Sequence, residues 1–159
     1  MNEVSDAIVI SERQHKTRAQ VQRDKVKIRL ATDEAGLLIA DVLKSNGIEL
    51  PFANWSKVFP SWLIATVDDD VIGCVQVMPA KPVGYAEWLY VKPSAPFKMR
   101  AIAVHKLIYA AIATVQQAGA SYITCLQDNN NTKFSDVLKK INFVPVSENT
   151  RLVKRLAGD

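Results

Sequence analysis

Hydrophobic and polar positions alternate along residues 25–30, a pattern typical of a strand with one buried face. Val26, Ile28 and Leu30 are expected to point inward, and the basic residues between them outward. A helical apolar pattern follows from Thr32 or Asp33, either of which can cap the helix, to Asn46-Gly47. The pattern therefore predicts a strand followed by a helix that runs through Leu37, Leu38, Ala40, Val42 and Leu43.

The middle of the chain predicts a hairpin and a further strand. Residues 62–67 and 71–78 are rich in β-branched side chains, and three aspartates separate them as a turn. Gly73, inside the second run, indicates a bulge or a close approach of backbone. Another strand is expected over residues 85–91.

A basic loop with Lys98 and Arg100 precedes the clearest helix of the sequence. Its apolar residues share one stripe at helical spacing: Val104, Leu107, Ile108, Ala111, Ile112 and Val115. Gly119 ends this helix, and residues 121–126 form the next strand. Strand, helix and strand in succession predict a right-handed crossover between parallel strands. A loop of this kind at a helix N-terminus suits a phosphate group.

The C-terminal part predicts one more helix and two strands. The apolar residues of the helix lie on one face, which comprises Phe134, Val137, Leu138 and Ile141. Asn142 follows the helix at a position that favours the left-handed conformation. Residues 143–146 and 151–156 are expected to form the last two strands of the sheet. The order β-α-β-β-β-α-β-α-β-β predicts an α/β fold with its ligand site near the middle strands.

The length of the chain and the distribution of its charges limit the possible domain organisation and partners. The 159 residues suit one domain, with a polar N-terminal arm over residues 1–24 and the domain over 25–159. Of the net charge of +4, most falls in residues 1–30, where seven basic and four acidic residues lie. The nearly neutral remainder disfavours a nucleic-acid partner, although a nucleic-acid-binding tail stays open.

The cysteines and the hydropathy pattern indicate a cytoplasmic protein. Cys74 and Cys125 lie in strand-like runs without metal-ligand spacing, which favours buried free thiols over zinc ligands or a disulfide. The three aspartates at 68–70 are expected to form a solvated turn, so no metal site is predicted. No apolar run of about 18 residues and no secretory signal are present, so no membrane association is expected.

Three segments together resemble the GNAT superfamily of N-acetyltransferases. WLIATVDDDVIGCVQV is similar to the second and third strands of the family, and YAEWLYVKP to its fourth strand. NNNTKFSDVLKKINF resembles its last helix. The resemblance covers about residues 26–156 and implies a mixed, mostly antiparallel sheet flanked by helices in a single domain.

The resemblance implies acetyl-CoA as cofactor and assigns its binding residues. The phosphate loop of the family, Q/R-x-x-G-x-G/A, falls on Lys98, Met99, Arg100, Ala101, Ile102 and Ala103. The pantetheine arm is expected along Leu89, Tyr90 and Val91, with further contacts from Asn131 and Phe134. Ala101 replaces the central glycine, which narrows the approach of the diphosphate to the backbone, and the basic residues of the loop can offset this.

Glu87 matches the general-base glutamate of the histone-acetylating members of the family. An amine is protonated at neutral pH and must lose a proton before it attacks a thioester. The tyrosine general acid of the family falls on Leu138, which cannot donate a proton, and Asn142 replaces a glycine. Ser135, Tyr122 or water stay open as the donor.

The sequence thus predicts an acetyl-CoA-dependent N-acetyltransferase that acts on a primary amine of a small molecule or a protein. Phe52, Trp55 and Phe59 are expected to shape the acceptor side, with core packing as the alternative. The alternative function is a catalytically degenerate GNAT-fold binding or structural module. A homodimer stays open.

Overall fold

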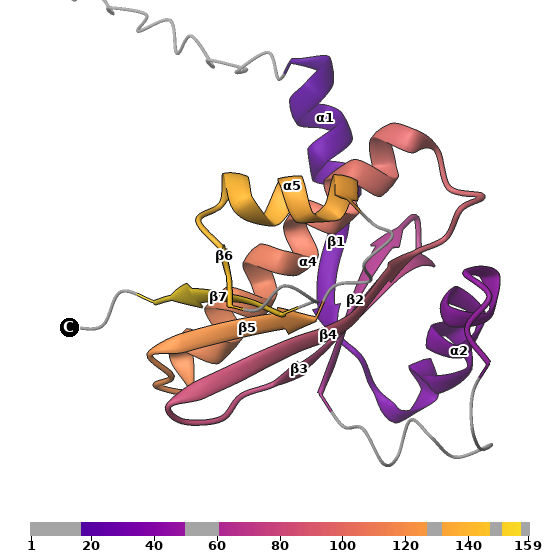
Figure 1. Ribbon diagram of the computed structural model, residues 1–159. Coiled ribbons are helices and arrows are strands. Elements are labelled where there is room, and N and C mark those ends of the chain that lie inside the picture. The colour runs from indigo at the N-terminus through magenta and orange to yellow at the C-terminus, as the bar shows by residue number, and fades with distance from the viewer. Residues whose placement is uncertain (1–16, 50–60, 127–131, 147–150, 157–159) are drawn as a thin grey trace, which may run out of the picture.

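A computed structural model describes residues 17–49, 61–126, 132–146 and 151–156 (Figure 1). It contains a seven-stranded sheet in the order β1-β2-β3-β4-β5-β7-β6. Every neighbouring pair is antiparallel except β4 and β5, which are parallel, as the crossover pattern predicts. The strands are β1 Lys27–Leu30, β2 Trp62–Val67, β3 Asp70–Met78, β4 Val83–Val91, β5 Tyr122–Leu126, β6 Val144–Pro145 and β7 Arg151–Arg155.

Helices cover both faces of the sheet. The long helix α4, Phe97–Gln117, and the helix α5, Thr132–Lys140, pack with one apolar core, and both lie above the sheet in Figure 1. A short 3₁₀ turn η1, Asp33–Ala35, and the helix α2, Gly36–Ser45, form a second core on the opposite side. The predicted α/β class with a mostly antiparallel sheet is confirmed.

The β2–β3 hairpin forms as the sequence predicts. Asp68 and Asp69 have φ of 47° and 71°, the positive values that a type I′ turn requires at its two central positions. An extra residue in β3 beside Gly73 shifts the register, because Ala65 faces Gly73 and Thr66 faces Val71. A Cβ at Gly73 would lie 3.1 Å from the carbonyl oxygen of Tyr90, so the close backbone approach is also present.

The crossover from β4 through α4 to β5 organises the larger core. The buried stripe of α4 comprises Ala103, Leu107, Ile108, Ala111 and Val115, while Val104 and Ile112 are only partly buried. Gly84 of β4 faces Val115 so closely that no Cβ fits between them. This contact fixes the spacing between the strand and the helix.

Three leucines of the N-terminal elements are exposed. Leu30 was expected to point inward but is 64% exposed, so that expectation was wrong. In the predicted helix, Leu37 is 85% exposed and Leu38 also faces outward. Ala35 and Ile39 supply the buried face of η1 and α2, together with Ala40, Val42 and Leu43. The apolar residues of this segment outnumber the positions that its short helix can bury, so hydrophobicity alone did not identify the buried face.

A short helix precedes β1. The segment Arg18–Lys25 forms α1, which begins at a capping box between Thr17 and Gln20 and has no buried residue. The alternating pattern placed Lys25 in the strand, whereas it ends α1. Lys106 of α4 holds the end of α1, because its Nζ donates to the carbonyl oxygens of Arg23 and Val26, both at 2.6 Å.

The C-terminal elements follow the predicted order. Leu138 of α5 and Phe143 are buried in the larger core, and Asn142 adopts the expected left-handed conformation with φ of 68°. Lys154 of β7 donates from Nζ to the carbonyl oxygen of Ile141 at 2.6 Å, which ties the end of α5 to the sheet. Within the described ranges, no helix has the length and apolar character needed to cross a membrane.

Candidate active site

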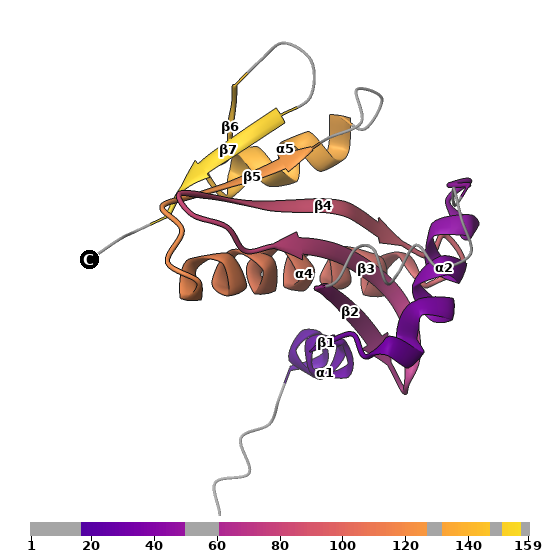
Figure 2. The same cartoon turned by 90° about the horizontal axis from the view of Figure 1, so that it is seen from below.

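A bulge in β4 lies just beyond the part of this strand that pairs with β5. Opposite Cys74 and Gln76 lie Tyr90 and Glu87, so β4 contains one extra residue, and Trp88 has φ of 55°. β4 pairs with β5 only from Val83 to Ala86. Figure 2 shows the two strands diverging beyond this pairing. A positive φ at a non-glycine residue is strained, and such strain is concentrated at functional sites.

A cavity of about 380 Å³ lies beside the part of β4 that does not pair with β5. The second half of β4, the first turns of α4 and one face of α5 form its walls; its lining residues are Asn46, Leu89, Tyr90, Val91, Phe97, Arg100, Ala101, Val104, His105, Lys133, Phe134 and Val137. Asn46 donates from Nδ2 to the carbonyl oxygen of Val91 at 3.0 Å, which joins the end of α2 to the end of β4. The cavity thus combines mostly apolar walls with a few polar groups, as ligand sites do.

Arg100 is the main charged group of this cavity. Its guanidinium lies 5.8 Å from the centroid of the Phe97 ring, and its Nε is buried with no hydrogen-bond partner in the described part of the chain. Arg100 N donates to the carbonyl oxygen of Pro96, the first intrahelical bond of α4. Helix geometry leaves the preceding N–H groups, those of residues 97–99, without an intrahelical acceptor. A guanidinium and a helix N-terminus therefore meet at one end of the cavity, an arrangement suited to an anion.

The expected basic loop over Lys98–Ala103 is instead helical, so this prediction was wrong. Residues 97–103 form the first two turns of α4, since they include no glycine and alanine favours helix. Lys98 is consequently exposed and does not line the cavity. Met99, Ile102 and Ala103 pack against the larger core, so none of their side chains reaches the cavity.

Apart from Glu87, the other predicted site residues divide into two groups. Leu89, Tyr90, Val91, Arg100, Ala101 and Phe134 line the cavity. Phe52, Trp55, Phe59 and Asn131 lie outside the described residues. Sequence reasoning missed Asn46, His105 and Lys133, and the signal for the last two was their place on the outer sides of α4 and α5 near the predicted site. Asn46 gave no local signal, because only the fold brings α2 to the end of β4.

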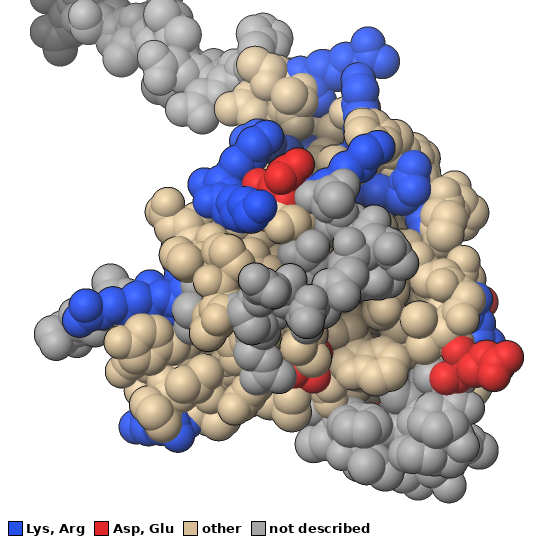
Figure 3. All heavy atoms as spheres, in the orientation of Figure 1, with Lys and Arg blue, Asp and Glu red and all other residues tan. Residues whose placement is uncertain are grey.

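Positive side chains surround this region. Lys and Arg gather along the upper edge of the molecule, over α1 and α5 (Figure 3). Lys133 lines the cavity, whereas the charge of Lys92, near the β4 end of the cavity, is offset by an ion pair with Asp41 at 2.6 Å. The local field therefore favours an anionic ligand.

Glu87 lies on the opposite face of the sheet from α4. Gly84 faces α4, so Tyr85 and Glu87 point to the other face, since side chains alternate along a strand. Glu87 is partly buried and lies directly opposite Gln76, which is only 2% exposed. Gln76 in turn lies opposite Trp62 of β2. These side chains form a polar row across the sheet, and the row ends where β4 and β5 separate.

The two side chains that stayed open as proton donors, Tyr122 and Ser135, do not line the cavity. Leu138 is fully buried in the core. Tyr122 pairs with Val83, at the end of β5 farther from Glu87, and Ser135 does not line the cavity. Cys125 is buried in the larger core and does not line the cavity, and burial, with a smaller effect of the Glu87 charge, raises the pKa of its thiol to about 12. Both cysteines are free and buried, as predicted.

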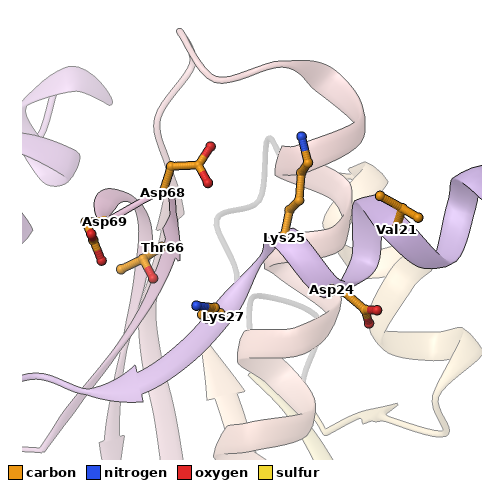
Figure 4. Close-up of a pocket in the computed structure, with 7 residues that line it drawn as sticks. All are labelled: Val21, Asp24, Lys25, Lys27, Thr66, Asp68 and Asp69. Carbon is orange, nitrogen blue, oxygen red and sulfur yellow. The ribbon is translucent and has the colours of Figure 1, made fainter.

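A second cavity, of about 520 Å³, lies elsewhere, between α1, β1 and the β2–β3 turn. Figure 4 shows Asp68 and Asp69 on one side and Asp24 on the other, with Lys25 and Lys27 between them. The carboxylates do not converge, and the described residues contain no cluster that could hold a metal ion. Despite its larger volume, this cavity is lined mainly by charged residues, and no helix N-terminus is among them.

The fold is that of the GNAT N-acetyltransferases. An N-acetyltransferase from Staphylococcus aureus Mu50 superposes with a TM-score of 0.69 at 16% identity, over 83% of this chain and 99% of that chain. An acetyltransferase from Salmonella typhimurium, solved with its cofactor acetyl-CoA, gives a TM-score of 0.64 at 12% identity, over 85% and 96% of the two chains.

N-acetylglutamate synthase from Neisseria gonorrhoeae, complexed with coenzyme A and L-arginine, gives a TM-score of 0.68 at 20% identity over 82% of this chain. The present chain spans about a third of the length of that synthase, since it covers 33% of it. No protein-family model and no curated protein sequence matches the chain. The predicted GNAT resemblance is thus confirmed at the level of fold.

Proposed function

We propose that this protein is an acetyl-CoA-dependent N-acetyltransferase that acts on a primary amine. The observation that carries the proposal is Arg100, which lines an apolar cavity at the N-terminus of α4 and whose buried Nε lacks a partner within the described residues. A buried polar atom of this kind is costly unless a ligand satisfies it. GNAT-fold proteins solved with coenzyme A support the choice of ligand.

The lining residues fit coenzyme A. Arg100 and the first N–H groups of α4 would hold the pyrophosphate, with Lys133 near the anionic end. The apolar side chains of Leu89, Val91 and Phe134 would pack along the pantetheine arm. When bound, acetyl-CoA supplies an acetyl group activated as a thioester.

Glu87 is proposed as the general base. Its place immediately after the last β4–β5 pair puts its carboxylate on the face opposite the cavity, where an acceptor can approach the opening between the strands. A positioned carboxylate contributes on the order of 10²–10⁴ in rate by accepting a proton from the nucleophile. The leaving sulfur would take up that proton from Glu87 or from water, because Leu138 is buried and apolar.

The buried Leu138 also supports the second candidate, a coenzyme-binding module without acetyl transfer. The two functions differ in turnover and share cofactor binding. A homodimer is compatible with either function, and a protein acceptor only with the first.

Replacing Glu87 with glutamine tests the base. Thiol release from acetyl-CoA would be followed with a panel of free amino acids, spermidine and a lysine-containing peptide. Glu87→Gln should lower turnover by about 10²-fold or more and leave acetyl-CoA binding unchanged. Glu34→Gln, an exposed carboxylate on η1, is the matched control and should behave as the wild type. Equal turnover of the two variants would remove Glu87 from the mechanism, and absence of turnover in wild type that binds acetyl-CoA would favour the binding module.

A further inference from the structure

Thr124 of β5 has a buried hydroxyl that the fold does not satisfy. Thr124 is 4% exposed, and its Oγ1 has no hydrogen-bond partner among the described residues. Valine has the same shape and favours strands equally, so a buried hydroxyl without a partner is the costlier choice at this position. Such a group points to a ligand that supplies the missing partner.

Thr124 lies on the same face of the sheet as Glu87. It pairs with Tyr85, and paired residues in neighbouring strands project from the same face. Glu87 is two residues beyond Tyr85 and therefore shares this face, on the far side of the last β4–β5 pair between Ala86 and Cys125. From strand rise and spacing, the Cα atoms of Thr124 and Glu87 are roughly 8 Å apart. A separation of this length can be bridged by one nitrogen atom that is hydrogen-bonded to both side chains.

We propose that Thr124 and Glu87 together hold the amino group of the acceptor. This inference rests on the proposed acetyltransferase function and adds the residue that selects the acceptor. A neutral primary amine has one lone pair and two N–H groups. One N–H donates to the Glu87 carboxylate and the other to Thr124 Oγ1, so the lone pair is left to point at the thioester carbon.

The transfer balances with these groups. The nitrogen forms a bond to the acetyl carbon, the carbon–sulfur bond breaks, and its electron pair leaves with sulfur. Glu87 accepts one amine proton and returns it to the sulfur, so the products are an N-acetylamide and the free thiol. The second N–H remains on nitrogen and keeps its bond to Thr124. A secondary amine has a single N–H, which Glu87 takes, so Thr124 confers preference for primary amines.

The test compares Thr124→Val, which removes the hydroxyl at constant shape, with Thr124→Ser, which keeps it. Without ligands, Thr124→Val should unfold at a higher temperature than the wild type, because an unsatisfied hydroxyl is removed. A markedly lower unfolding temperature would mean that the fold itself uses the hydroxyl, and it would overturn the inference without any assay of activity.

The second readout is transfer from acetyl-CoA to the amines of the panel named above. For the best primary amine, Thr124→Val should raise KM by about fivefold with little change in kcat, the effect of one neutral hydrogen bond, while Thr124→Ser stays near the wild type. For the N-methyl derivative of that amine, the wild type and Thr124→Val should have the same KM. Unchanged KM for the primary amine in Thr124→Val would refute the inference.

The increase in unfolding temperature on adding acetyl-CoA distinguishes a failure of the Thr124 inference from a failure of the proposed function. All three proteins should show the same acetyl-CoA shift in unfolding temperature. Loss of the shift in the wild type would refute the proposed function, whereas a normal shift with no effect of Thr124→Val refutes the role of Thr124 alone. No transfer to any amine of the panel would overturn this inference and the amine acceptor together, and would leave cofactor binding standing.

Discussion

Replacing Arg100 with methionine should weaken coenzyme A binding without harming the fold. Methionine keeps the apolar stem beside Phe97 and removes the guanidinium, whose Nε is buried without a partner in the described chain. The free protein therefore loses no hydrogen bond of that atom, and its stability should stay the same or increase. In the complex, the loss is that of the charged hydrogen bonds to phosphate.

The structure sets the size of the effect. A hydrogen bond to a charged group is worth about 1.5–3 kcal/mol, so Kd for coenzyme A should rise about 10- to 150-fold in Arg100→Met. Lys98→Met is the matched control, since it removes one charge from the same helical turn but at an exposed position outside the cavity. Exposed charges contribute about 0–1 kcal/mol, so this variant should lose no more than about fivefold.

Calorimetric titration with coenzyme A and with pantetheine, which has no phosphate, measures the affinity of each variant for both ligands. Arg100→Met should lose affinity for coenzyme A and keep the wild-type affinity for pantetheine. Equal losses in Arg100→Met and Lys98→Met would show that only net charge matters. A parallel loss for pantetheine would show that Arg100 supports the cavity wall instead of binding phosphate.

Two further predictions concern the core. Gly84→Ala should lower the free energy of unfolding in urea by about 1–3 kcal/mol, because the new methyl group clashes with Val115. Adding Val115→Ala should recover most of this loss, whereas additive losses in the double variant would contradict the contact. Burial raises the pKa of the Cys74 and Cys125 thiols from 9.0 to about 12, so the folded state keeps their protons where the unfolded state loses them. Their contribution to stability is thus complete below pH 9 and declines as pH rises toward 12. Neither thiol should react with a disulfide reagent at pH 8 before unfolding, and rapid labelling of the native protein would contradict their burial.

Local sequence patterns predicted the turns and helices whose conformation is determined by residues close to one another in the sequence. The run of aspartates predicted the turn and the apolar stripe predicted the long helix, and both patterns are visible in the sequence, whereas the positive φ at Asp68 and Asp69 is seen only in the structure. The parallel pairing of β4 and β5 followed from the handedness of the crossover. Family resemblance, rather than pattern, placed Leu89–Val91 and Arg100 at one site.

The features that sequence reasoning missed depend on contacts between distant segments. The bulge at Trp88 follows from the register between β3 and β4, and Asn46 reaches the cavity only because α2 ends beside Val91. Lys98 and Arg100 were both expected to face a phosphate, yet one helical turn points the first to solvent and the second into the cavity. The unpaired Thr124 hydroxyl is equally invisible without the sheet around it.

The central claim, that the cavity beside β4 binds acetyl-CoA, is tested most directly by thermal unfolding with and without this ligand. At about 100 times Kd, a ligand adds about 2.7 kcal/mol of stability, which for a domain of this size raises the unfolding temperature by about 5–10 °C. The wild type should show this shift with acetyl-CoA, whereas ATP, a polyanion without pantetheine, should give a much smaller one. No shift at millimolar acetyl-CoA, or an equal shift with ATP, would contradict the claim.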